Sequence, residues 1–188
     1  MCIRDRKQPV VFLFGGSGSE PTSTAISIFK ALEPTSPNAK DVASGNATSG
    51  AGTSSPIQSP FNLAFIAALD HFDTFVTKVA DFTVRGVLSS PKSLQIMRDD
   101  REVGAVCLLG IEWSLSTAMA NAAGVMPDYV LGYSLGEFAA AAVCGHISLP
   151  EAIALVRLVI VVARTAHIEG TGDMLSICLL YTSDAADE

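Results

Sequence analysis

The segment that most limits what this chain can fold into is Gly-Tyr-Ser-Leu-Gly-Glu at residues 132–137. The short apolar run before it, residues 128–131, suits a buried strand. The alanine-rich run after it, residues 138–144, is typical of a helix. Glycines two positions before and after the serine leave room for a sharp turn between the two. The pattern therefore predicts a nucleophile elbow with Ser134 at its tip, and the simpler alternative is an ordinary serine N-cap.

The predicted turn also explains why a serine at this place can react. A hydroxyl becomes a useful nucleophile when a base takes its proton and its oxygen is free of neighbouring side chains. At a helix N-terminus, unpaired backbone N–H groups and the helix dipole favour the negative charge that develops during attack on a carbonyl. The N–H of Leu135 is then the natural first donor of an oxyanion hole.

Composition indicates a globular chain and excludes several classes of partner. The chain has 188 residues, 49% of them hydrophobic, and a formal net charge of −7, which argues against nucleic acid or an anionic membrane as the partner. We expect no membrane span, because Arg157 and Arg164 interrupt the most hydrophobic helix. Since a secretion signal is also absent, we expect a cytoplasmic location.

The four cysteines predict neither a metal site nor a disulfide framework. They lack metal-ligand spacing and lie in apolar surroundings, so we expect buried free thiols and no metal; they occupy positions 2, 107, 144 and 178.

The rest of the chain predicts one more strand, a short extended piece and several helices. Residues 9–14 form a continuous apolar run that predicts a strand buried on both faces of a parallel sheet. The glycine-rich loop that follows lacks the Lys-Ser/Thr pair and the glycine spacing of phosphate-binding loops. Helices are expected at residues 22–32, 61–79, 90–98, 102–123 and 148–167, the last opened by a capping box of Ser148 and Glu151, and a short extended piece at residues 84–88.

Residues 131–156, taken together, resemble the active-site block of the malonyl-CoA:acyl carrier protein transacylase family. This family includes the acyltransferase domains of fatty acid and polyketide synthases. Its usual form is G-H-S-L-G-E, an alanine-rich helix, a glycine, a short apolar turn and a second helix. The resemblance implies an α/β fold, a hydrolase-like three-layer domain with a parallel central sheet. The family's small ferredoxin-like subdomain would be truncated or absent.

The resemblance also assigns site residues. The loop after the first strand is similar to the family's P-G-Q-G-S-Q motif, in which the backbone N–H of the middle glutamine completes the oxyanion hole. Ser17 stands at that position. Tyr133 replaces the usual histidine before the serine, and Val159 stands where malonyl-specific members have an arginine that pairs with the free carboxylate. A valine there implies a preference for acyl groups without a carboxylate.

The implied activity is transfer of an acyl group from coenzyme A, through an ester on Ser134, to the phosphopantetheine thiol of an acyl carrier protein. No bound cofactor is implied, and neighbouring synthase domains are expected partners. The family's catalytic histidine lies on a later segment that this sequence lacks, and neither His146 nor His167 occupies a family position. We therefore expect chain 1–188 to activate Ser134 poorly.

Residues 7–177 are interpreted as a partial acyltransferase domain interrupted by a low-complexity surface loop at residues 34–60. Residues 1–6 and 178–188 look like translated sequencing-adapter sequence and are set aside. Two alternatives stay open: an α/β-hydrolase or patatin-like serine esterase, and a catalytically silent scaffold piece of a synthase.

Overall fold

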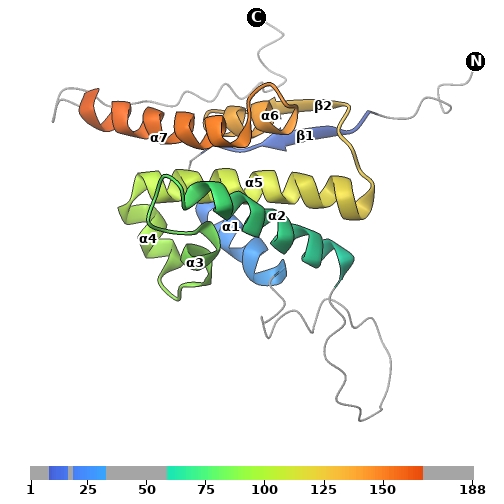
Figure 1. The fold of residues 1–188 in the computed structure, drawn as a ribbon, viewed down its shortest axis with the longest axis horizontal. Helices are drawn as coiled ribbons and strands as arrows, with labels where there is room; N and C mark the ends of the chain where they lie inside the picture. Colours follow the sequence, from blue (N-terminus) through green and yellow to red (C-terminus); the bar gives the residue numbers. More distant parts are fainter. Residues whose placement is uncertain (1–8, 17–18, 33–58, 167–188) are drawn as a thin grey trace, which may run out of the picture.

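The computed structural model of the chain describes residues 9–16, 19–32 and 59–166 (Figure 1). The predicted insertion at residues 34–60 falls almost wholly outside these ranges, as do both ends of the chain. In chain order the elements are β1 (Val11–Phe14), α1 (Ser19–Leu32), α2 (Pro60–Val76), α3 (Val84–Ser89), α4 (Ser93–Asp99), α5 (Arg101–Ala123), β2 (Tyr129–Gly132), α6 (Gly136–Val143) and α7 (Leu149–Ala166).

The strands β1 and β2 lie side by side and parallel, with Val11 opposite Tyr129 and Phe14 opposite Gly132. Because side chains alternate along a strand, one face of this sheet carries Phe14 into the core, while the opposite face is exposed. The exposed side chains of that outer face are Val11, Leu13, Tyr129 and Leu131.

The observed α/β class agrees with the predicted one in its coarse form. The architecture is mainly helical with a small parallel sheet, and the hydrolase-like layering is not seen in the described residues. We expected the first strand to be buried on both faces, and among the described residues this is wrong. Only the inner face of the sheet is packed, and Leu13 on the outer face is 73% exposed.

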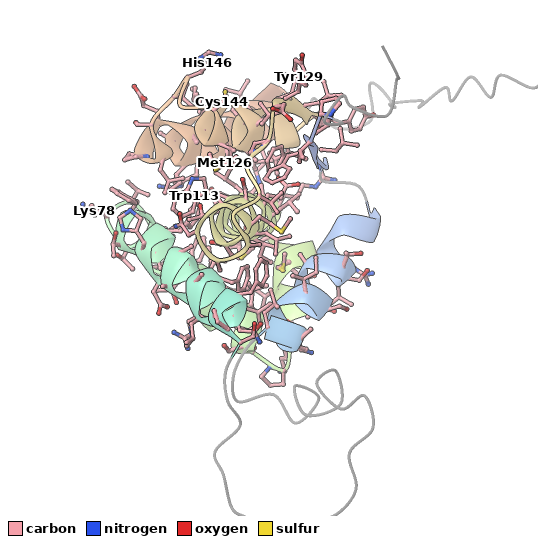
Figure 2. The ribbon with its side chains drawn as sticks, turned by 90° about the vertical axis from the view of Figure 1, so that its right-hand side faces the viewer. Lys78, Trp113, Met126, Tyr129, Cys144 and His146 are labelled. Atoms are coloured by element: carbon pink, nitrogen blue, oxygen red, sulfur yellow. The ribbon has the colours of Figure 1, made fainter. Side chains whose placement is uncertain are left out.

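Helix α5 is the centre of the molecule. Figure 1 shows it between an upper level formed by the sheet, α6 and α7 and a lower level formed by α1 to α4. In Figure 2, where α5 is seen end on, the other elements surround it. The fully buried side chains that α5 contributes include Val106, Cys107 and Leu109.

Contrary to the expectation from the sequence, α5 is long and apolar enough to cross a membrane. Residues Arg101–Ala123 meet that test by length and composition alone, and half of the apolar window is buried inside the protein. A core helix of a globular protein passes the same test. Its packing on several sides therefore identifies α5 as a core helix.

Residues 84–88 are helical rather than extended, and local capping explains the difference. The Asp73 carboxylate accepts hydrogen bonds from the N–H groups of Val84 (2.7 Å) and Arg85 (3.1 Å). The Thr83 hydroxyl accepts a third from Gly86 (3.0 Å). These acceptors satisfy the otherwise unpaired donors of the first turn of α3, which an apolar β-branched run alone does not reveal.

Two other predicted helix ends are confirmed, and one differs. The predicted capping box at the start of α7 is present, with the Ser148 N–H and hydroxyl both donating to Glu151 Oε2, at 2.7 and 2.6 Å. Gly124 ends α5 in the left-handed conformation, with a φ of 64°. Helix α4 begins at Ser93, a little after the predicted start at residue 90.

The prediction of buried free thiols is right for Cys107 and wrong for Cys144. Cys107 is buried, and burial raises the pKa of its thiol well above the ordinary value. Cys144 is a free thiol but is exposed, because it follows the last turn of α6 at the surface shown in Figure 2. Cys2 and Cys178 lie outside the described residues.

Candidate active site

The serine at the tip of the predicted turn has the backbone conformation that an elbow requires. Strand β2 ends at Gly132 and helix α6 begins at Gly136, so only three residues separate them. Ser134 has a φ of 54°, the one positive value at a non-glycine residue in the described part of the chain. This left-handed conformation disfavours any residue with a Cβ, and such strain is concentrated at functional sites.

Both elbow glycines are required by close backbone approach. A Cβ on Gly132 would overlap the backbone of Glu137 in the first turn of α6. A Cβ on Gly136 would overlap the carbonyl oxygens of Phe14 and Gly15 at the end of β1. The two glycines therefore let the helix fold back tightly onto the strand and let its N-terminus press against β1.

The loop after β1 lies directly against the elbow. The Tyr133 N–H donates to the Phe14 carbonyl (3.0 Å), and a Cβ placed on Gly16 would lie 3.0 Å from the Ser134 Cβ. This is the loop for which an oxyanion donor was predicted. Ser17, the residue named for that role, lies outside the described residues, so its role stays a prediction.

The backbone amides of the elbow differ in whether they have a hydrogen-bond acceptor. Ser134 is exposed, whereas the Leu135 side chain is 5% exposed and anchors the turn in the core. Within the described ranges the Leu135 N–H has no hydrogen-bond acceptor, and the N–H groups of Gly136 and Glu137 are used within the turn. Among the described residues the Leu135 amide is thus an unpaired donor in the residue after the serine, and its role as an oxyanion donor stays a prediction.

No general base is identified among the described residues by a hydrogen bond to the serine hydroxyl. Across the described ranges the Ser134 hydroxyl has no hydrogen-bond partner. The ring of His71, on α2, contacts Phe75 and Trp113, with centroids 5.2 and 6.0 Å apart. His146 is exposed beyond the end of α6 (Figure 2). The described residues also hold no cluster of side chains suited to a metal ion.

The residues predicted to line the acyl pocket are on the surface in this structure. Tyr133 is 74% exposed beside the serine, and Val159 is 44% exposed on α7. Their roles stay predictions.

The two arginines near Val159 on α7 already have partners on α5 or at its start. Arg157 Nε donates to Glu102 Oε1 (2.6 Å), and Arg164 Nη2 donates to Asp100 Oδ1 (2.8 Å). Neither guanidinium is therefore free to take the place of the family's carboxylate-binding arginine.

Sequence reasoning missed Glu112, which lies under the loop after β1. Its Oε1 accepts a hydrogen bond from the Gly15 N–H (2.7 Å), and its Oε2 is buried with no partner among the described residues. Burial raises the pKa of Glu112 to about 7, and the Gly15 N–H opposes that rise. A signal was present, since Glu112 is the sole charged residue between Glu102 and Asp128.

Comparison with known proteins gives a consistent result. Residues 60–187 match the model of the acyl transferase domain family. The chain is 33% identical over 126 residues to a phenolphthiocerol/phthiocerol polyketide synthase protein of Mycobacterium tuberculosis, and equally to that of Mycobacterium bovis. It is 27% identical over 147 residues to the non-reducing polyketide synthase cla3 of Cladosporium cladosporioides.

These alignments cover 66% and 78% of this chain but only 8% and 6% of the relatives, so the chain spans a small part of their length. The family match covers more than half of the chain and includes the elbow described above. The chain belongs to the acyl transferase domain family found in polyketide synthases.

Proposed function

We propose that this domain takes an acyl group from an acyl-coenzyme A as an ester on Ser134 and passes it to the phosphopantetheine thiol of an acyl carrier protein. The observation that carries the proposal is the left-handed φ of Ser134 beside the unpaired Leu135 amide, at the end of two parallel strands. Family membership supports acyl transfer as the reaction class. An acyl-coenzyme A substrate also agrees with the predicted cytoplasmic location.

The reaction has two balanced halves. In the first, a base removes the Ser134 proton while its Oγ attacks the thioester carbonyl. The C–S bond then breaks, and coenzyme A leaves as the thiol with that proton. In the second, the pantetheine thiol loses its proton to the same base and attacks the serine ester, and Ser134 recovers its proton as it leaves. The Leu135 N–H, and by resemblance the Ser17 N–H, would receive the oxyanion in both halves.

We propose that the base is the family's histidine, located in the full-length protein, since no described side chain forms a hydrogen bond with the Ser134 hydroxyl. Chain 1–188 alone should then form the ester slowly. Rapid loading of purified chain 1–188 would contradict this expectation.

We also propose that the acyl group carries no carboxylate. By the family resemblance Val159 would line the acyl pocket, and a carboxylate bound there would lack a cationic partner, because Arg157 and Arg164 are paired with residues on α5 or at its start. Introducing Val159→Arg into the full-length protein should improve malonyl transfer relative to acetyl transfer. No change in that ratio would count against the assignment of this position.

The test of the whole proposal is mass spectrometry of the Ser134 peptide after incubation of the full-length protein with several acyl-coenzyme A substrates. Ser134→Ala is the control, and a carrier protein is added in a second step. An ester on Ser134 that moves to the carrier protein supports the proposal. An ester released only to water would indicate an esterase, and the absence of any ester would indicate a silent scaffold.

A further inference from the structure

We propose that Glu112 is a positioning residue for acyl transfer, because its carboxyl group holds the loop after β1 against the nucleophile elbow. The inference rests on the proposed function, since it concerns the alignment of the loop for which an oxyanion donor is predicted. Glu112 does not touch the reacting atoms and acts through the backbone of that loop.

A short chain of contacts links α5 to the serine. The Gly15 N–H donates to Glu112 Oε1 (2.7 Å), and the next residue, Gly16, packs against Ser134 and Tyr133. Gly15 and Gly16 have no side chains with which to hold themselves in place. Among the described residues the Glu112 carboxyl is the side chain that fixes the loop by a hydrogen bond.

The surroundings of Glu112 make a packing role alone a poor explanation. It borders a cavity of about 270 Å³ between β1 and α5, together with Leu115, Ser116, Met119 and the four residues of β1. No other described titratable side chain lines this cavity. A carboxyl group in such a place is unfavourable unless its hydrogen bonds compensate, and an apolar side chain would fill the same space without that penalty.

Protonation of Glu112 changes the strength of the anchor. An ionised carboxylate makes a stronger hydrogen bond to a backbone N–H than a neutral acid does. Burial, the largest influence on this group, raises its pKa to about 7. The loop is therefore held more tightly above neutral pH than below it, and a glutamine at this position would hold it equally at all pH values.

The first measurement is amide hydrogen exchange at Gly15 and Gly16 in the full chain. Glu112→Leu should raise exchange at Gly15 at least about tenfold, whereas Glu112→Gln, which keeps an acceptor oxygen, should change it little. Glu102→Gln is the matched control, because Glu102 is a partly buried carboxylate on the same helix that pairs with Arg157 instead. Unchanged exchange in Glu112→Leu would overturn the proposal.

The second measurement is the rate of Ser134 acylation in the full-length protein between pH 5.5 and 8.5. Glu112→Leu should lower the rate about tenfold, since small displacements at an active site have effects of this size or larger. Glu112→Gln should keep most of the wild-type rate at pH 8. Because the general base titrates in both proteins, the readout is the ratio of the Glu112→Gln rate to the wild-type rate, which should rise as the pH falls through the pKa of Glu112. A Leu variant that loads as fast as wild type, or a Gln to wild-type ratio that does not change with pH, would also overturn the proposal.

The two measurements separate this inference from the proposed function. If wild-type protein forms no ester on Ser134, the proposed function fails, and the role in acyl transfer fails with it. The exchange data alone would then show whether Glu112 holds the loop. If the ester forms but neither exchange nor rate depends on Glu112, only the positioning role is wrong.

Discussion

Replacing Ser134 by glycine should stabilise the folded chain. Ser134 has a φ of 54°, and a left-handed residue with a Cβ is disfavoured by about 1–2 kcal/mol. The substitution loses little else, because the side chain is exposed and its hydroxyl has no described hydrogen-bond partner. Glycine also has more conformational freedom than serine in the unfolded chain, and this reduces the stabilisation by about 0.4–1 kcal/mol. The net expectation is a stabilisation of about 1 kcal/mol.

The matched control is Ser134→Ala, which removes the hydroxyl but keeps the Cβ and hence the strain. Its free energy of unfolding should stay within about 0.5 kcal/mol of the wild-type value. Urea unfolding of the three proteins measures both differences, and thermal unfolding should show a Tm about 2–4 °C higher for the glycine variant. If Ser134→Gly proves no more stable than Ser134→Ala, the turn is not strained at this residue and the argument for an elbow is refuted.

Three further substitutions test the packing around the site. Gly136→Ala should lower the free energy of unfolding by about 2 kcal/mol in urea titrations, because its Cβ would overlap backbone atoms of β1 that cannot move aside; a change under about 0.5 kcal/mol would contradict the close approach. Ser114→Ala should be neutral or stabilising by up to about 1 kcal/mol in the same assay, since the fully buried Ser114 hydroxyl has no described hydrogen-bond partner. A clear decrease in the free energy of unfolding would contradict this and indicate that the hydroxyl has a partner. For Glu112, whose folded pKa is raised from 4.5 to about 7, the contribution of this group to stability, measured as the difference between wild type and Glu112→Gln, should be greatest below pH 4.5 and fall by at most about 3 kcal/mol as pH rises through about 7. Unfolding curves at pH 4.5, 6 and 8 check this, and parallel pH profiles of the two proteins would refute it.

The elbow could be predicted from the sequence because its determinants are local. Two glycines, a strand before and a helix former after them lie within one short segment, and each choice agrees with the next. The same holds for the capping box of α7 and for Gly124, whose effects act over one turn of chain. Features of this kind depend on neighbours in sequence, so a single sequence is enough to find them.

Other features could not be predicted because they depend on distant partners. Residues 84–88 form a helix because Asp73, which lies on the preceding helix α2, caps its first N–H groups. Glu112 and Gly15 are 97 residues apart, and nothing local to either suggests their hydrogen bond. Whether the outer face of the sheet is covered likewise depends on packing rather than on the apolar composition of β1.

We propose that substitutions in the loop after β1 are compatible with acyl transfer. In a parallel pair the carboxyl ends of both strands meet at one edge, and Phe14 opposite Gly132 places the two following turns together. Main-chain amides at that edge, such as that of Leu135, keep their direction whatever side chain they carry, provided the backbone is held. We propose that Glu112 holds this backbone in place through its hydrogen bond from the Gly15 N–H. On this proposal, Ser17 in place of the family's glutamine would remove a side chain without removing a main-chain donor, and activity would depend on the rigidity of the loop.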